Sequence, residues 1–107
     1  MIGISVVVPT LNEKSNLKPL IERIGGSLKI AGFDYEIIIV DDHSTDSSNL
    51  VIQSLTKKFP IRFYTKRGLK GKAQSLIEGF SYAKYPLIAM IDADLQYPPE
   101  AIPKMIE

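Results

Sequence analysis

Short apolar segments rich in β-branched residues alternate with longer amphipathic segments along this chain, and this alternation limits the folds open to it. Four ranges have the composition of β-strands: residues 4–8, 35–40, 61–64 and 87–91. The run over residues 37–40, Ile-Ile-Ile-Val, is apolar at every position. Both faces of that strand should therefore be buried, which is typical of a parallel sheet.

The segments between these strands have apolar residues at helical spacing. This spacing predicts helices over about residues 14–30, 45–58 and 73–83, and a further one from about residue 99. Ser44 or Thr45 would be the N-cap of the second helix. The βαβαβαβα order predicts an α/β fold with an open parallel sheet of about four strands, right-handed crossovers and helices on both faces. Because the last helix is so short before Glu107, we expect a domain that is truncated at its C-terminus.

The composition fits one small soluble domain and excludes several functions. The chain has 107 residues, 45% of them hydrophobic, and its net charge of +1 offers no basic excess for nucleic acid. The absence of cysteine excludes disulfides, thiolate metal sites and a cysteine nucleophile. The N-terminus lacks the features of a signal peptide, and the longest apolar run is far shorter than the roughly 20 residues of a membrane span. We therefore expect a cytoplasmic domain.

Polar residues follow each predicted strand, at the edge of an open α/β sheet where ligands bind. These segments are residues 9–13, 41–46, 66–72 and 92–96. Carboxylates follow the second and fourth strands, and cations follow the third. The sequence therefore predicts a binding site at the carboxyl edge of the sheet.

Asp92 and Asp94 are the most specific feature of this edge. At positions i and i+2 of an extended stretch, both carboxylates point the same way and repel each other unless a cation lies between them. Mg²⁺ or Mn²⁺ takes oxygen ligands of this kind and shares its other positions with phosphate and water. Gln96 would add an amide oxygen on the same side. The alternative is that the two aspartates end the strand and cap a turn.

The acidic residues after the second strand also have two possible roles. One carboxylate of the pair Asp41 and Asp42 could accept hydrogen bonds from a nucleobase or a ribose, or Asp42 or Asp46 could simply cap the helix that follows; both roles stay open for Asp41. Capping is favoured for Asp46. His43 is the chain's only histidine, and a surface position is favoured for it over a catalytic one.

A basic segment with two glycines precedes the third predicted helix. Its cations and backbone amides could meet a phosphate at the helix N-terminus. The alternative, favoured for most of these cations, is a solvated basic loop. The residues concerned are Lys66, Arg67, Lys70 and Lys72. Tyr97, further along the chain, could stack on a ligand or cover the edge of the sheet.

Four strings in this sequence together resemble the family 2 glycosyltransferases with the A-type fold, and most closely the dolichyl- or polyprenyl-phosphate mannose and glucose synthases. The strings have the order and spacing of that family and span nearly the whole chain. They are VVVPTLNE (6–13), VDDHSTDSS (40–48), GLKGKAQSLIEGF (68–80) and IDADLQYPPE (91–100).

The resemblance implies inverting transfer of a hexose from a nucleotide-diphosphate sugar, GDP-mannose or UDP-glucose for example, to a polyprenyl or dolichyl phosphate. It also implies Mg²⁺ or Mn²⁺ at the diphosphate, bound by Asp92, Asp94 and Gln96. The residues that it implies for the nucleotide-sugar pocket are Pro9, Thr10, Glu13, Asp41, Asp42, Lys72, Asp92 and Ala93.

His43 and Tyr97 depart from the pattern of the family. The family continues well past Glu107, so the resemblance implies that the acceptor site, the catalytic base and any membrane segments lie downstream. The parent enzyme would then be cytoplasmic or lie at the cytoplasmic face of a membrane. This chain alone would keep only the donor site, and its exposed sheet edge would favour self-association.

Other functions fit the pattern less well. A phosphatase related to haloacid dehalogenases has its Asp-x-Asp pair after the first strand, whereas here the pair follows the fourth. A receiver module needs an acidic pair after its first strand and a phosphoacceptor after its third. Within the family, a saccharide acceptor is the alternative to a lipid phosphate. A non-catalytic nucleotide-binding fragment is the alternative to an enzyme.

Overall fold

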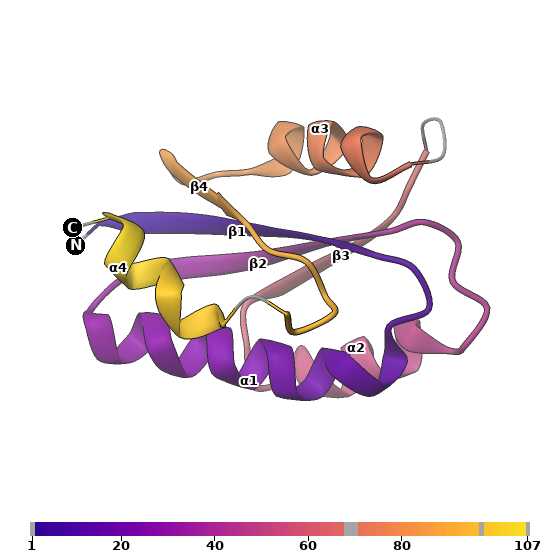
Figure 1. Ribbon diagram of the computed structural model, residues 1–107, viewed down its shortest axis with the longest axis horizontal. Coiled ribbons are helices and arrows are strands. Elements are labelled where there is room, and N and C mark those ends of the chain that lie inside the picture. Colours follow the sequence, from indigo (N-terminus) through magenta and orange to yellow (C-terminus); the bar gives the residue numbers. More distant parts are fainter. Residues whose placement is uncertain (1, 68–70, 97, 107) are drawn as a thin grey trace.

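The computed structural model describes residues 2–67, 71–96 and 98–106. Its strands form a four-stranded parallel sheet with the order β3-β2-β1-β4 (Figure 1). The strands are β1 (Gly3–Thr10), β2 (Asp34–Asp41), β3 (Ile61–Thr65) and β4 (Leu87–Met90). The predicted α/β fold with an open parallel sheet of about four strands is confirmed.

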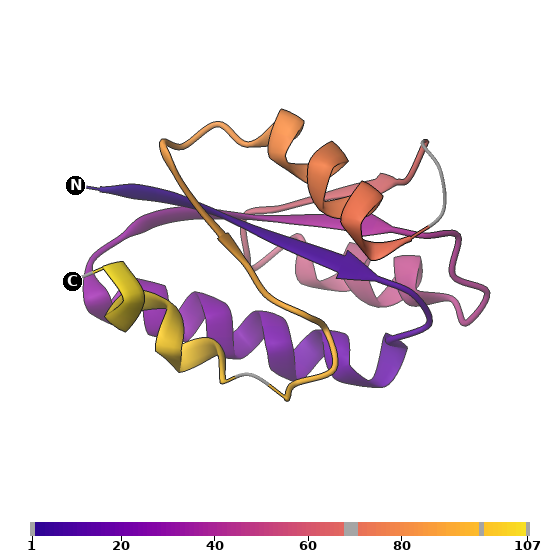
Figure 2. The same cartoon turned by 45° about the horizontal axis from the view of Figure 1, so that its top comes forward.

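Helices cover both faces of the sheet, as predicted. They are α1 (Lys14–Ala31), α2 (Ser48–Leu55), α3 (Lys72–Tyr82), the 3₁₀ turn η1 (Pro99–Ala101) and α4 (Ile102–Ile106). Figures 1 and 2 show α3 on one face and α1, α2 and α4 on the other. The sheet is therefore the middle layer of three, with its carboxyl edge open to ligands.

The larger part of the core lies between the sheet and α1. The fully buried stripe of α1 consists of Leu17, Leu20, Ile21, Ile24 and Leu28. It packs against alternate residues of the two central strands: Ile4, Val6, Val8, Ile37 and Ile39. On the opposite face, Val7, Ile38 and Val40 form a smaller cluster beneath α3. Both central strands are thus buried on both faces, which explains the uninterrupted apolar run in β2.

Gly79 allows α3 to lie directly on the sheet. A Cβ atom at this position would lie 2.4 Å from Val7 Cγ1 and 3.2 Å from Val40 Cγ2. We expect Gly79→Ala to lower the free energy of unfolding by about 1–3 kcal/mol, because the helix must move off the sheet. Urea denaturation measures this change. Gly26 of α1 is the matched control, since nothing lies within 4 Å of a Cβ built there. Gly26→Ala should not destabilise the protein, and equal losses at both positions would contradict the clash.

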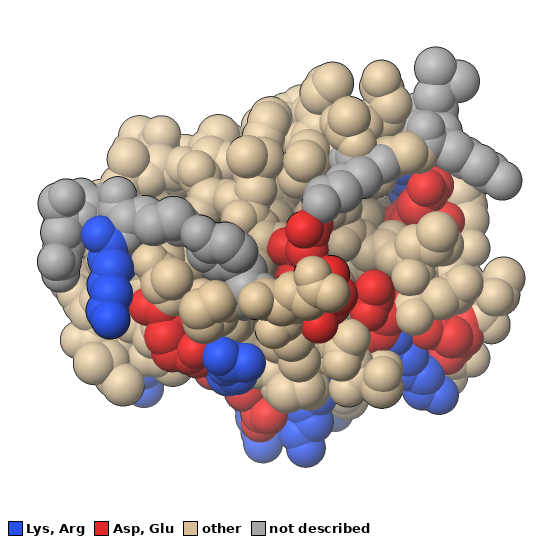
Figure 3. Space-filling view, viewed as in Figure 1, with Lys and Arg blue, Asp and Glu red and all other residues tan. Residues whose placement is uncertain are grey.

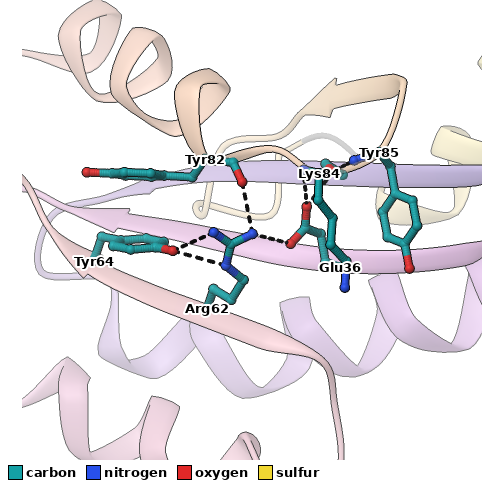
Figure 4. A network of polar contacts seen from close by, with 7 residues as sticks. Glu36, Arg62, Tyr64, Tyr82, Lys84 and Tyr85 are labelled. Carbon is teal, nitrogen blue, oxygen red and sulfur yellow. Dashed lines mark hydrogen bonds and ion pairs between the residues drawn. The ribbon is translucent and has the colours of Figure 1, made fainter.

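A polar network lies on the α3 face of the sheet, next to the point where α3 ends (Figure 4). The carboxylate of Glu36 is buried and accepts hydrogen bonds from Ser5 Oγ at 2.6 Å and from the Lys84 backbone N–H at 2.8 Å. Arg62 Nη1 donates to the same carboxylate at 2.8 Å and to the Tyr82 carbonyl oxygen at 2.9 Å. The network therefore ties the connection between α3 and β4 to the first three strands.

The start of the second helix differs from the prediction. α2 spans Ser48–Leu55 rather than residues 45–58, and neither Ser44 nor Thr45 is its N-cap. Instead, the Ser44 N–H and Oγ donate to the carboxylate of Asp41 at 2.8 and 2.5 Å. These bonds keep Ser44 in the loop, so the N-cap prediction was wrong because Ser44 has a competing partner at the end of the strand.

β1 also extends further than predicted, through Pro9 to Thr10. Proline has no N–H to donate, which normally ends a central strand. Here β4 pairs with β1 only as far as Val7, so Pro9 lies beyond the ladder on that side of β1.

β4 lies at one edge of the described sheet. Two apolar residues of this strand, Ile88 and Met90, are 44% and 54% exposed. An exposed apolar edge strand favours pairing with another chain, and self-association therefore stays a prediction. Within residues 2–67, 71–96 and 98–106, no helix is both long enough and apolar enough to cross a membrane.

Candidate functional site

The parallel register brings the loops that follow the strands to one edge of the sheet. Thr10 pairs with Asp41, and Asp41 pairs with Thr65, so β1, β2 and β3 end level with one another. A pocket of about 270 Å³ opens at this edge. It is lined by Pro9, Thr10, Leu11, Glu13, Asp42, Ser75, Asp92, Ala93 and Asp94. Figure 3 shows acidic side chains gathered on this face around the loop that follows β4.

Most of the residues implied by the sequence strings lie together in this pocket. They are Pro9, Thr10, Glu13, Asp42, Asp92, Ala93 and Asp94. Leu11 and Ser75 also line it, although no sequence pattern singled them out. Both lie inside the matching strings, and Ser75 is buried on α3, so its position in its string was the available signal.

Asp92 and Asp94 converge on the pocket through a turn. The premise of an extended stretch was wrong, because residues 93 and 94 form a turn and Leu95 has a φ of 62°. The Gln96 N–H donates to Asp94 Oδ1 at 3.1 Å, so the turn-capping role also exists. Ala93 is only 3% exposed between the two acids, which anchors the turn in the core. Both carboxylates nevertheless line the same pocket.

Asp41 and Asp42 have different surroundings. Asp41 is buried, and its carboxylate accepts hydrogen bonds from Thr10 Oγ1 at 2.7 Å and from both donors of Ser44. It lies not in the first pocket but in a neighbouring depression of about 460 Å³, together with His43. Asp42 lines the first pocket, and its buried Oδ1 has no hydrogen-bond partner in the described part of the chain. A role for Asp41 in holding a base or ribose stays a prediction.

Lys66 is fully buried rather than part of a solvated loop. Its Nζ donates to the Gly71 carbonyl oxygen at 2.7 Å and lies 3.8 Å from Asp42 Oδ2. These partners compensate for the loss of water, since a buried charge is tolerated only when it is paired and hydrogen-bonded. The solvated-loop prediction was therefore wrong for Lys66, while Arg67 is exposed as expected.

Other predicted residues lie outside the pocket or outside the described structure. Gln96 is exposed and does not line the pocket formed by the described residues. Lys72 begins α3, but its side chain is not among those described. Tyr97 and residues 68–70, including Lys70, also lie outside the described residues.

The oxygen donors around the pocket suit a hard divalent cation. They are the carboxylates of Glu13, Asp42, Asp92 and Asp94. Among the described residues, however, no group of three or more acidic, histidine or cysteine side chains could hold a metal ion. An ion at this edge would therefore need oxygen ligands from a bound molecule or from water, in addition to those of the protein.

Comparisons with known proteins agree with the sequence strings. Residues 5–107 match the family model for glycosyl transferase family 2. The chain is 42% identical over 104 residues to a dolichol-phosphate mannosyltransferase of Pyrococcus furiosus, covering 97% of this chain and 29% of that protein. It is 36% identical over 106 residues to an undecaprenyl-phosphate 4-deoxy-4-formamido-L-arabinose transferase of an Enterobacter species, covering 96% of this chain and 32% of that protein. The chain thus spans about a third of the length of these relatives.

A solved structure with a similar fold is glucosyl-3-phosphoglycerate synthase from Mycobacterium tuberculosis, in complex with Mn²⁺, UDP and glucosyl-3-phosphoglycerate. The TM-score is 0.77 at 24% identity, and the match covers 94% of this chain and 37% of the other. This likeness confirms the glycosyltransferase A-type fold. Because the family match extends over nearly the whole chain, this protein belongs to glycosyl transferase family 2.

Proposed function

We propose that this chain binds a nucleotide-diphosphate sugar, of the GDP-mannose or UDP-glucose type, together with Mg²⁺ or Mn²⁺. One observation carries the proposal: residues from all four sequence strings that resemble the family line a single pocket. The string at residues 68–80 contributes Ser75. Loops far apart in the sequence therefore meet where an A-type glycosyltransferase needs its donor site.

Asp92 and Asp94 would hold the cation in this proposal. Their carboxylates are hard oxygen donors on one pocket, which is the donor set that Mg²⁺ or Mn²⁺ uses beside phosphate oxygens and water. The bound cation would act as a Lewis acid that stabilises the charge on the departing diphosphate.

Asp42 supports a polar ligand in the same pocket. Its Oδ1 is buried without a hydrogen-bond partner among the described residues, and its side chain is 13% exposed. A buried acceptor without a donor costs free energy. A hydroxyl or N–H group of the ligand would supply the missing donor, and Thr10 and Glu13 would form the neighbouring wall.

The acceptor of the parent enzyme would be a polyprenyl or dolichyl phosphate, reached by inverting transfer. The names of the two relatives specify different sugars, mannose and a formamido-arabinose, but both specify a lipid phosphate. The acceptor class is thus the property that these two relatives share, whereas the sugar differs between them. In this proposal the 107-residue chain supplies donor binding, and transfer belongs to the longer enzyme.

Titration calorimetry with the 107-residue chain tests the proposal. UDP and GDP are titrated separately in Mn²⁺, in Mg²⁺ and in excess EDTA. We expect one of the two nucleotides to bind with metal and to bind at least about tenfold more weakly with EDTA, because a cation held by Asp92 and Asp94 would neutralise the charge of the diphosphate. Equal affinity with and without metal would refute the metal site. No binding of either nucleotide under any condition would refute the donor site.

A further inference from the structure

The loops that follow β1 and β2 hold each other through reciprocal hydrogen bonds. The Asn12 N–H donates to Ser44 Oγ at 2.8 Å, and the Thr45 N–H donates to Asn12 Oδ1 at 2.8 Å. Asn12, His43 and Ser47 have φ angles of 53°, 59° and 64°. Residues other than glycine keep such angles only where the surrounding structure stabilises them. The two loops therefore depend on each other for their conformations.

Asp46 serves two helices at this contact. Its Oδ2 accepts the N–H of Lys14, the first residue of α1, at 3.0 Å. Its Oδ1 accepts the N–H of Ser48, the first residue of α2, at 3.1 Å, and the Ser48 hydroxyl as well. Glu13 and Ser47, which occupy the two N-cap positions, make no side-chain cap hydrogen bond. One carboxylate thus caps both helix N-termini. The sequence predicted that Asp46 caps only the helix that follows it.

The charge of Asp46 suits this position. Helix N-termini attract anions, and neither α1 nor α2 has an acidic residue in its first turn. The hydrogen bond from the Ser48 side chain has the largest effect on the pKa of Asp46 and lowers it; burial opposes this, and the backbone N–H groups of Lys14 and Ser48 reinforce it. The carboxylate is therefore ionised at neutral pH, where both caps need it.

Asp46 is not among the residues that line the pocket, but both loops that it joins contribute to that lining. Leu11 and Glu13 precede α1, and Asp42 lies in the loop before α2. The geometry points to Asp46 as a positioning residue for the nucleotide-sugar site, because its carboxylate sets the spacing of these two loops. The role rests on the proposed function and acts through the backbone rather than through contact with the ligand.

Asp46→Asn tests this role, since asparagine keeps the size of the side chain but has one acceptor oxygen for the two helices. We expect the dissociation constant for UDP or GDP with Mn²⁺ to rise about tenfold. We also expect faster hydrogen exchange at the backbone amides of Lys14 and Ser48. Glu100→Gln is the matched control: it removes an equal charge and, with it, the ion pair to Arg23 on α1, but it touches neither loop. Its affinity should equal that of the unaltered chain.

The outcomes separate the two proposals. Unchanged affinity in Asp46→Asn, with faster exchange at the two amides, would overturn the positioning role and leave the donor site standing. No binding by the unaltered chain would remove the donor site and this role together. Circular dichroism gives the folded fraction of each variant, and each dissociation constant is calculated from the concentration of folded protein. A loss of affinity that disappears after this correction also overturns the role.

Discussion

Asp92→Asn and Asp94→Asn should each weaken the binding of UDP or GDP in Mn²⁺ by about 10- to 100-fold. A loss of this size is typical when a residue that hydrogen-bonds to a metal ligand is replaced. Asparagine keeps the size of the side chain but removes the negative charge that would hold the cation in the proposed site. Because both side chains line the pocket from one turn, either substitution should act on the same ion. Calorimetry with and without EDTA gives the metal-dependent part of the affinity.

Asp34→Asn is the control for these two variants. Asp34 is exposed at the start of β2, at the opposite end of the sheet from the pocket. The substitution removes the same charge as Asp92→Asn or Asp94→Asn, but far from the pocket. Its affinity should match that of the unaltered chain. Retention of full metal-dependent affinity in both Asp92→Asn and Asp94→Asn would refute the assignment of this pair, whereas an equal loss in Asp34→Asn would point to an effect of net charge.

Glu36→Ala should lower the free energy of unfolding by about 2–3 kcal/mol, less than the full loss expected for breaking a buried ion pair. The substitution leaves the Ser5 hydroxyl and the Lys84 N–H without their acceptor on the α3 face of the sheet. The Ser5 hydroxyl is buried, and a buried donor without an acceptor is costly. The contribution of Arg62 is discounted because its side chain is 38% exposed and can be hydrated instead. Urea denaturation measures the loss, and a change within the error of the Asp34→Asn control would contradict it.

The pH dependence of stability gives an independent measure of the same network. Burial acts to raise the pKa of Glu36, but the hydrogen bonds from Ser5, the Lys84 N–H and Arg62 outweigh it, and the pKa lies below its ordinary value. The folded state therefore releases this proton more readily than the unfolded state. Its stabilisation is complete above the unfolded pKa of about 4.3 and is lost as the pH falls through the folded pKa.

The stability difference between the unaltered chain and Glu36→Gln should accordingly shrink as the pH is lowered below about 5. Glutamine keeps the shape of the side chain and cannot titrate, so the difference isolates the charge of Glu36 from other acids. Measuring both proteins by urea denaturation across this range tests the sign. A difference that stays constant or grows at acidic pH would show that the ionised form of Glu36 is not the stabilising one.

Much of the fold and of the pocket followed from local patterns. The apolar runs predicted the strands, and the run in β2 indicated burial on both faces, because side-chain periodicity depends on near neighbours. Pocket residues such as Thr10, Glu13 and Asp92 followed from their strings and from the rule that ligands bind at the carboxyl edge of the sheet. The order of the elements was enough to bring these segments to one edge.

Local patterns failed where two segments compete for one side chain. Ser44 has the composition of an N-cap, but the end of β2 takes both of its donors. Lys66 has the composition of a solvated loop residue, but the Gly71 carbonyl of its own loop and the Asp42 carboxylate from another segment replace its water. Neither outcome can be inferred from sequence spacing, because it depends on which groups the folded chain brings within hydrogen-bonding distance.

By itself, then, the amino-acid sequence determined the α/β class, the edge at which the candidate site lies and the family to which the chain belongs. Those properties depend on the order, spacing and type of residues along the chain. Only the tertiary structure decided that the Asp92–Asp94 stretch is a turn, that Lys66 is buried and that Asp46 caps two helices. For Asp46 the physical reason is the separation of the partners: Asp46 and Lys14 are 32 residues apart in the chain, and only the parallel pairing of β1 with β2 brings them into contact.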